Sequence, residues 1–200
     1  MSQPFQQIFT PPIPDQSSAE QQLFNFMNKI NQWLKIEAQN NPSNLLNVQN
    51  ATRSINECYL KKQEVLILTN FQLSTLPPEI KTMVNLKKIY LDNNLFEKIP
   101  LEIFGLINLE LLVLSSNRLS ELSPQISQLT GLKELYLEKN LLRNLPVHEI
   151  KKLRNLRQLS ISQNFIEEKP KLDRKIRLYC DGNPFLKKNI FNKINRAIAI

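Results

Sequence analysis

A stretch of about 23 residues recurs along the chain with its leucines at fixed positions. Regular copies begin at Leu86, Leu109, Leu132 and Leu156, so that successive copies are 23, 23 and 24 residues apart. An irregular copy begins at Glu64, and a shortened one, IRLYCDGNPF, closes the series. A fixed period of this length indicates that one small structural unit is built several times and stacked upon itself.

Each regular copy contains the pattern L-x-x-L-x-L-x-x-N-x-L, which is the signature of a leucine-rich repeat. In the L-x-L part, alternate residues face opposite sides of an extended strand, so Ile89 and Leu91 are expected to point into the core. The asparagine after the strand is expected to satisfy backbone groups where the chain turns inward, groups that would cost about 1–3 kcal/mol each if left unpaired. These asparagines are Asn94, Asn117, Asn140 and Asn164.

Together the patterns predict an α/β fold, a leucine-rich-repeat solenoid of about six repeats of 23 residues that occupies residues 63–183. Parallel strands are expected on its concave face and irregular return segments on its convex face. The return segments are expected to begin at Pro77, Pro100 and Pro146. Each is expected to bury one isoleucine, namely Ile80, Ile103, Ile126 and Ile150. Because no repeat can bury its apolar face alone, neighbouring repeats must share one core.

The two edges of such a solenoid must be covered. Residues 18–62 predict two helices that cap the N-terminal edge, the first opened by a capping box at Ser17 or Ser18 with Glu20 or Gln21. Apolar residues then follow at helical spacing. Before Asn41 and Pro42 they are Leu23, Phe26, Met27, Ile30, Trp33 and Leu34, and after them Leu46, Ala51, Ile55 and Cys58. Residues 184–200 carry a further apolar stripe and predict a short helical cap at the C-terminal edge.

The ends of the chain differ in charge. Residues 1–16 have no Lys or Arg and no apolar run, so they do not have the form of a cleavable secretory signal, and residues 1–17 are expected to be a disordered tail. No stretch approaches the ~20 apolar residues of a membrane span.

The net charge of +8 lies in residues 149–200, which hold 13 Lys and Arg against 5 Asp and Glu. A solvated face is the simplest interpretation of this basic part, and peripheral contact with an anionic membrane stays open. The lack of interleaved aromatic residues argues against nucleic acid.

No pattern points to catalysis, a cofactor or a metal. The single histidine, His148, has no partner motif, and the chain has no glycine-rich phosphate loop and no cysteine pair at metal-ligand spacing. Cys58 belongs to the N-terminal cap and Cys180 to the last strand, about five strand spacings of ~4.8 Å away, which is too far for a disulfide. Both are expected to be inert core thiols, and caps without disulfides favour a reducing compartment. The sequence therefore predicts a protein that is not an enzyme, and we expect a monomer.

Residues between the inward leucines are expected to face outward, in columns across the concave face. The central column is Ile67, Tyr90, Val113, Tyr136, Ser160 and Tyr179. The column before it is Val65, Lys88, Leu111, Glu134, Gln158 and Arg177, and the column after it is Thr69, Asp92, Ser115, Glu138, Ser162 and Asp181. Exposed aromatic residues with polar neighbours are typical of binding hot spots; the alternative is that these side chains only stack on each other. The predicted partner-binding residues are Lys88, Tyr90, Asp92, Val113, Glu134, Tyr136, Glu138, Arg177 and Tyr179.

The cap and the first repeat resemble a bacterial family. The stretch INQWLKIEAQNNPSNLLNVQNATRSINECYL, followed by VLILTNFQLSTLPPEI, is similar to the start of the type III effector leucine-rich-repeat proteins of the IpaH and YopM class. The matching features are Trp33, Ile55 with Cys58, and Leu73 to Pro77, and the match covers roughly residues 20–80. The resemblance implies delivery into the cytoplasm of a eukaryotic host cell and binding of a host protein. The polar tail before Ser17 is compatible with an export signal of that kind.

Two features depart from that family. Its repeats are usually shorter, about 20–22 residues, whereas those of about 23 residues look more like the intracellular repeats of Ras-linked scaffold proteins. Some members carry a ubiquitin-ligase domain with a catalytic cysteine after the repeats, and the residues that follow the repeats here are too few for one.

The leading hypothesis is a non-enzymatic protein-binding module, a secreted bacterial effector that binds a host protein through its concave face. One alternative is the substrate-recognition half of a multidomain ubiquitin ligase, which a reading frame continuing past Ile200 would favour. Another is a cytosolic scaffold protein that stays in its own cell, which an export assay on residues 1–20 would separate. The identity of the partner does not follow from the sequence.

Overall fold

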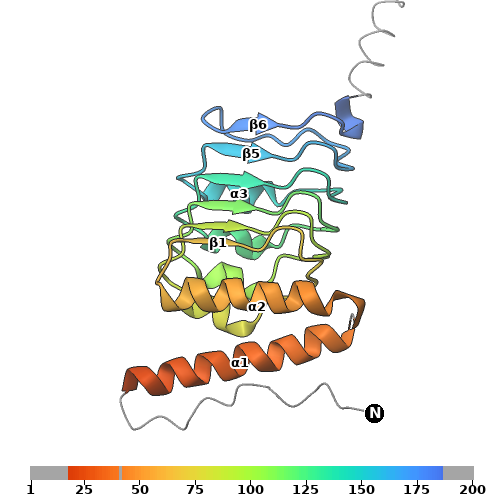
Figure 1. Cartoon of the computed structure of the whole chain (residues 1–200). Coiled ribbons are helices and arrows are strands. Elements are labelled where there is room, and N and C mark those ends of the chain that lie inside the picture. The colour runs from red at the N-terminus through yellow and green to blue at the C-terminus, as the bar shows by residue number, and fades with distance from the viewer. Residues whose placement is uncertain (1–17, 41, 187–200) are drawn as a thin grey trace, which may run out of the picture.

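The computed structural model describes residues 18–40 and 42–186, which form a curved solenoid with two helices at its N-terminal edge (Figure 1). Six short strands make one parallel sheet in the order β1 to β6. Their bounds are Val65–Ile67 for β1, Lys88–Tyr90 for β2, Leu111–Val113 for β3, Glu134–Tyr136 for β4, Gln158–Ser160 for β5 and Arg177–Tyr179 for β6. Each strand pairs with the next one along the chain, so the predicted repeat architecture is confirmed.

The inward row of the sheet is apolar throughout. The register aligns the central residues of the strands, which are Leu66, Ile89, Leu112, Leu135, Leu159 and Leu178. All of these are buried except Leu178, which is partly buried on the last strand. Burial of one such side chain contributes about 1.5–3 kcal/mol relative to leaving it exposed. The alternation of inward and outward residues expected from the L-x-L pattern is therefore confirmed.

One asparagine per repeat closes the turn after the strand. The Oδ1 atom of Asn94 accepts a hydrogen bond from the backbone N–H of Leu73 at 2.9 Å. Its Nδ2 atom donates to the carbonyls of Leu68 at 2.7 Å and Leu91 at 2.9 Å. The same set of bonds recurs at Asn117, Asn140 and Asn164, as the sequence predicts. A further member, Asn183, bonds the N–H of Ile166 in the last turn.

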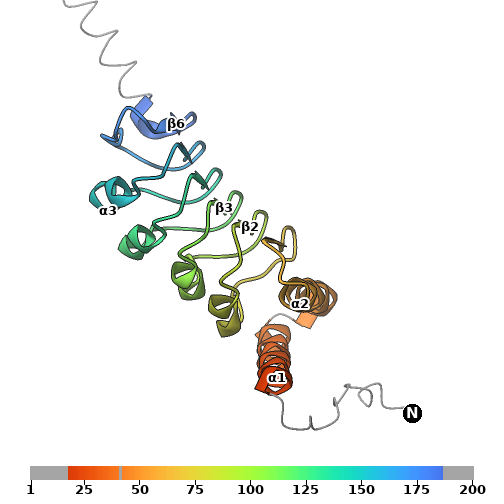
Figure 2. The same ribbon diagram turned by 90° about the vertical axis from the view of Figure 1, so that its left-hand side faces the viewer.

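The return segments are more regular than expected. Three of them are short 3-10 helices and one is α-helical: η2 (Pro78–Thr82), η3 (Leu101–Gly105), η4 (Pro124–Gln128) and α3 (Val147–Lys152). Residues Pro77, Pro100, Ser123 and Pro146 precede them, and the predicted isoleucines at 80, 103, 126 and 150 are all fully buried. In Figure 2 these helices spread more widely than the strands do, which leaves the sheet on the concave side.

Two antiparallel helices cover the N-terminal edge of the solenoid. Helix α1 (Ser18–Asn40) packs on α2 (Leu45–Leu60), which packs on β1, and a short turn, η1 (Pro42–Asn44), joins them. The rings of Phe26 and Tyr59 stack between the two helices with their centroids 3.6 Å apart. The expected buried stripe of α1 is confirmed at Phe26, Ile30 and Trp33.

One residue of the expected stripe of α2 was misplaced. Leu46 is 69% exposed, and Val48 is buried in its stead with Ala51, Ile55 and Cys58. At 100° per residue, position 46 lies on the opposite side of the helix from position 48. The prediction from sequence spacing therefore placed Leu46 on the wrong face of α2.

Parts of the sequence-based expectations lie outside the described residues. These are the tail at 1–17, the capping box at Ser17 and the side chain of Ser18, and the expected C-terminal cap beyond Leu186. Within residues 18–40 and 42–186, no helix has the length and apolar character that would let it cross a membrane.

Candidate functional site: the concave face

The outward side chains of the sheet form the columns that the sequence predicts. One column of the register runs in order through Lys88, Leu111, Glu134, Gln158 and Arg177. The next column runs in order through Tyr90, Val113, Tyr136, Ser160 and Tyr179. We refer to these side chains, together with Asp92, Ser115 and Glu138 of the next column, as the concave face. All nine predicted residues lie on it, because every repeat places the same position of the pattern at the same point of the sheet.

Exposure varies along the central column. Ile67 at one end is 57% exposed and Tyr179 at the other end is 39% exposed, while Tyr90, Val113 and Tyr136 are half-buried. Ser160, which lies between Tyr136 and Tyr179 in the register, is buried. The apolar stripe expected from the sequence is thus interrupted at β5, and the accessible aromatic surface lies on either side of the interruption.

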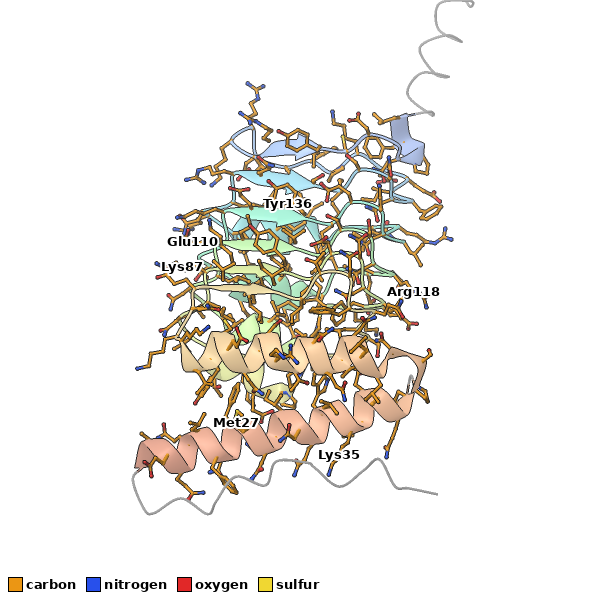
Figure 3. The ribbon with its side chains drawn as sticks, in the orientation of Figure 1. Met27, Lys35, Lys87, Glu110, Arg118 and Tyr136 are labelled. Carbon is orange, nitrogen blue, oxygen red and sulfur yellow. The ribbon has the colours of Figure 1, made fainter. Side chains whose placement is uncertain are left out.

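Tyr136 is held in place by polar contacts in the middle of the sheet (Figure 3). Its hydroxyl donates to Oε2 of Glu134 at 2.7 Å and accepts from Nε2 of Gln158 at 2.5 Å. Partial burial, followed by the interaction with Glu134, raises the pKa of Tyr136 to about 12. The three side chains therefore form one fixed polar unit across β4 and β5.

The acidic column is also braced by neighbouring repeats. The hydroxyl of Thr69 donates to Oδ1 of Asp92 at 3.0 Å, and Nδ2 of Asn93 donates to Oδ2 of the same carboxylate at 3.1 Å. One repeat further on, the hydroxyl of Ser115 donates to Glu138. The two hydroxyl bonds each join one repeat to a carboxylate of the next repeat, so the acidic side chains are ordered before any partner arrives.

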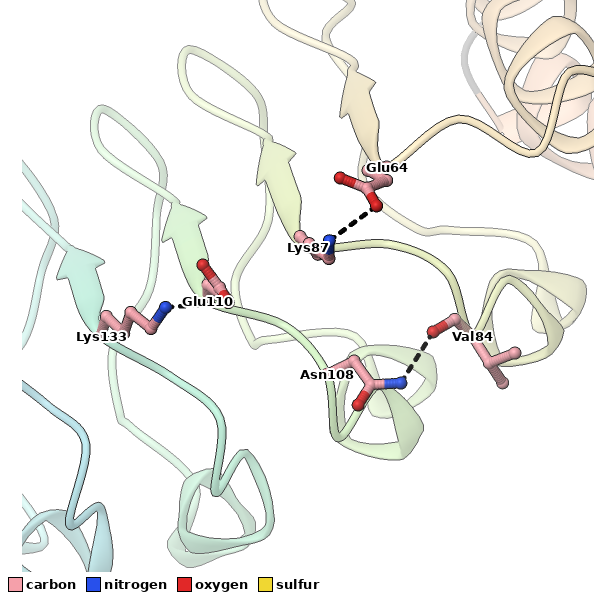
Figure 4. A network of polar contacts seen from close by, with 6 residues as sticks. All are labelled: Glu64, Val84, Lys87, Asn108, Glu110 and Lys133. Atoms are coloured by element: carbon pink, nitrogen blue, oxygen red, sulfur yellow. Dashed lines mark hydrogen bonds and ion pairs between the residues drawn. The ribbon is translucent and has the colours of Figure 1, made fainter.

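A row of charges at the entrance to the strands was not predicted (Figure 4). Lys87 pairs with Glu64 at 2.6 Å, and Lys133 pairs with Glu110 at 2.8 Å. The bond to Glu64 raises the pKa of Lys87, and the bond from Lys133 holds the pKa of Glu110 below its ordinary value. Opposite charges 23 positions apart were the signal in the sequence that could have revealed this row.

The row ends at β5, where the equivalent position is Arg157. Its guanidinium donates to the carbonyls of Arg154 at 3.0 Å and Leu156 at 3.2 Å, and Nζ of Lys175 donates to the same carbonyl of Arg154 at 3.1 Å. In the part of the chain that the structure describes, no carboxylate forms an ion pair with Arg157 or Lys175. Part of the excess basic charge noted in the sequence therefore lies at Arg157 and Lys175, near the start of β5 and β6.

The remaining reactive or titratable side chains lie far apart in the structure. Cys58 is buried in the cap and burial raises its pKa to about 11, while Cys180 is half-buried with its pKa also raised by burial. Both thiols are free. His148 is exposed on α3, with its Nε2 atom 3.9 Å from Glu149. Among the described residues, no group of three or more His, Cys, Asp or Glu side chains is placed to hold a metal ion.

Comparisons with known proteins agree with this geometry. The family model described as "Leucine rich repeat" matches two overlapping segments, residues 84–128 and 107–166. No curated protein matches the chain significantly.

Three solved structures share the fold. The leucine-rich-repeat domain of a Shigella effector is 23% identical, covers 80% of this chain and 65% of its own, and gives a TM-score of 0.60. YopM, a leucine-rich effector protein from Yersinia pestis, is 20% identical, covers 80% of this chain and 48% of its own, and gives a TM-score of 0.63. Internalin C2 from Listeria monocytogenes is 21% identical over 66% of this chain and 55% of its own, with a TM-score of 0.53. The chain spans less than two thirds of the length of each of them.

The matched repeats and the parallel sheet identify the fold as a leucine-rich-repeat solenoid with a helical cap at its N-terminal edge. Leucine-rich repeats generally serve as protein-interaction modules and are generally not enzymes. The concave face described above is the part of this solenoid where ordered aromatic and acidic side chains are accessible.

Proposed function

We propose that the chain binds a protein partner through its concave face and acts as a bacterial effector in the cytoplasm of a host cell. The observation that carries the first part is the ordered polar unit of Glu134, Tyr136 and Gln158, which lies between the exposed side chains of Ile67 and Tyr179. Six strands at ~4.8 Å give a face roughly 25–30 Å wide. That width matches the footprint of one partner in a protein interface of standard size.

Ordering of the face before binding supports the proposal. Because the hydroxyl of Tyr136 and the carboxylates of Asp92 and Glu138 already have partners within the sheet, little side-chain entropy remains to be lost when another protein covers them. Aromatic rings fixed in this way are the usual anchors of interfaces. The acidic column beside them would select a partner with basic residues at the matching position.

Effector function is supported by the order of parts. A two-helix cap followed by leucine-rich repeats is the arrangement that the sequence shares with the IpaH and YopM class, and the Shigella and Yersinia effectors have the same fold. Export of residues 1–20 fused to a reporter, dependent on a type III secretion system, is the expected result. Retention of that fusion inside the bacterium would instead favour a scaffold protein of the producing cell.

The binding site can be tested with two matched pairs of substitutions. Tyr136→Ala with Glu138→Lys removes the central ring and reverses one acidic charge without touching an inward leucine. Loss of one hot-spot aromatic costs about 2 kcal/mol or more, which is over tenfold in affinity. The control is Lys151→Glu with Lys152→Glu on the exposed surface of α3. The concave pair should abolish capture of the partner from host lysate and the convex pair should spare it; the reverse result would move the site to the basic convex surface.

A further inference from the structure

The described residues also form a groove that lies away from the concave face. This groove, of about 1240 Å³, runs between α1 and the turns that lead into η2, η3 and η4. None of its lining residues belongs to the columns of the concave face. Ile36 on α1 and Leu101 on η3 line it while 57% and 67% exposed. Exposed apolar side chains that line a hollow of this size are typical of a surface that another molecule covers.

The groove carries an excess of acidic charge. Four glutamates and two lysines line it, which leaves a formal charge of −2 in a chain whose net charge is +8. Lys98 already pairs with Glu121 at 3.1 Å, and Lys29 pairs with Glu79 at 3.3 Å. Among the described residues, Glu97 and Glu102 have neither an ion pair nor a side-chain hydrogen bond. The charges that remain unmatched in the groove are therefore both negative.

One of the acidic groups is buried and only half satisfied. Glu79 is 7% exposed, and its Oε1 atom accepts the contact from Lys29. Its Oε2 atom is buried and has no hydrogen-bond partner within the described part of the chain. Lys29 is 62% exposed in its side chain, so it can move away at little cost. A guanidinium can bond both oxygens of a carboxylate at once, which a single ammonium contact at this position does not do.

We propose that the groove binds a peptide segment of a partner protein in which an arginine lies beside apolar residues. The arginine replaces Lys29 on Glu79 and bonds both carboxylate oxygens. The apolar residues of the peptide cover Ile36 and Leu101, and a further basic residue lies against Glu97 or Glu102. This site is separate from the one proposed on the concave face, and neither proposal depends on the other.

The single tryptophan of the chain reports on this site. Trp33 lines the groove, and its Nε1 atom donates to the hydroxyl of Thr75 at 2.9 Å. The experiment titrates the full chain, at low salt, with a synthetic helical peptide that bears arginine and leucine on one face. The same peptide with citrulline in place of arginine is the neutral control of equal shape. A saturable change in Trp33 fluorescence is expected with the arginine peptide, and binding at least about tenfold weaker with the citrulline peptide.

Substitutions then test the position of the peptide. Glu97→Gln with Glu102→Gln should weaken binding about tenfold, and Leu101→Ser should weaken it as well. Glu97 and Leu101 are exposed and Glu102 is half-buried without a side-chain partner among the described residues, so these changes should leave the fold intact. Glu168→Gln with Asp173→Asn makes the same change of charge on exposed residues of the last repeat and should leave the affinity unchanged. Equal affinity for the two peptides, or equal loss in both charge variants, would overturn the proposal. A change of fluorescence with protein concentration alone would also overturn it, because the groove would then hold a second copy of the chain.

Discussion

The carboxylate of Glu37 accepts a hydrogen bond of 2.6 Å from the hydroxyl of Thr75, which fastens the first helix to the turn after β1. The other oxygen of Glu37 accepts from the backbone N–H and the hydroxyl of Ser74, at 2.8 and 2.9 Å. Glu37 is only 2% exposed. The cap is therefore joined to the solenoid by a buried polar contact as well as by apolar packing.

Removal of this contact should loosen the cap. Glu37→Ala leaves the N–H of Ser74 without its acceptor and should lower the free energy of unfolding by about 2–3 kcal/mol, because hydrogen bonds to charged groups are among the strong ones. Denaturant melts followed by the fluorescence of Trp33, which bonds the same threonine, measure the change. Gln39→Ala, on the exposed side of α1, is the control and should stay within about 0.5 kcal/mol of the wild type. A melt of Glu37→Ala that matches the control would contradict this role.

The asparagine after each strand should stabilise the fold through the backbone groups that it pairs. Asn140→Ala removes the acceptor of the N–H of Leu119 and the donor to the carbonyls of Leu114 and Leu137. Buried groups left unpaired cost about 1–3 kcal/mol each, so a loss of about 2–4 kcal/mol is expected in chemical denaturation. Asn144→Ala, four residues later and exposed, should have almost no effect. Equal stability of the two variants would mean that the turns do not depend on the side chain.

The correction on α2 makes a prediction about the cap. Val48→Ala empties a fully buried site and should cost about 1–3 kcal/mol, whereas Leu46→Ser changes a side chain that is 69% exposed and should cost less than about 0.5 kcal/mol. Thermal unfolding of both variants measures the difference. If the order of the two effects were reversed, the face of α2 that packs on the solenoid would have to be reassigned.

The environment of Tyr136 predicts a change of stability in alkali. Its pKa of about 12 in the folded chain lies above the ordinary value of 10.0, so the folded state holds this proton more tightly than the unfolded state. The stability from this group is therefore fully present below pH 10 and is lost as the pH rises through 12. Absorbance titration should show one tyrosine that ionises late, and Tyr136→Phe should remove that titration. A tyrosinate spectrum complete by pH 11 would contradict the partly buried, hydrogen-bonded environment of Tyr136.

The sequence predicted features that repeat, and it missed contacts that occur once. The strands, the inward leucines, the turn asparagines and the columns of the concave face all follow from one period, since every copy imposes the same geometry on its neighbour. The bonds that Glu37 accepts from Ser74 and Thr75 join the cap to the first, irregular copy, across 37 and 38 positions, and no other copy has an equivalent of Glu37. The misplacement of Leu46 has the same origin, because a short apolar stripe without a period can be placed on either face of a helix.

For the candidate site, too, the sequence predicted the repeated positions but not the individual side-chain contacts. Position within the repeat identified all the side chains that face outward, including Tyr136 and Glu138. It placed Ser160 in the central column, but it could not show that Ser160 would be buried there, or that the hydroxyl of Tyr136 would bond both Glu134 and Gln158. Those facts depend on side-chain length and rotamer in three adjacent strands, which a one-dimensional pattern does not contain.

The bonds of the turn asparagines also give the solenoid a direction. Asn94 serves the carbonyl of Leu68 and the N–H of Leu73, both of which precede it by a whole repeat, and the later asparagines do the same. A chain that leaves the ribosome from its N-terminus therefore exposes each turn before the asparagine that completes it has been synthesised. The newest turn is always unfinished, and synthesis of about one further repeat closes it. We expect the nascent protein to become resistant to proteolysis in steps of about 23 residues, each one repeat behind the point of synthesis.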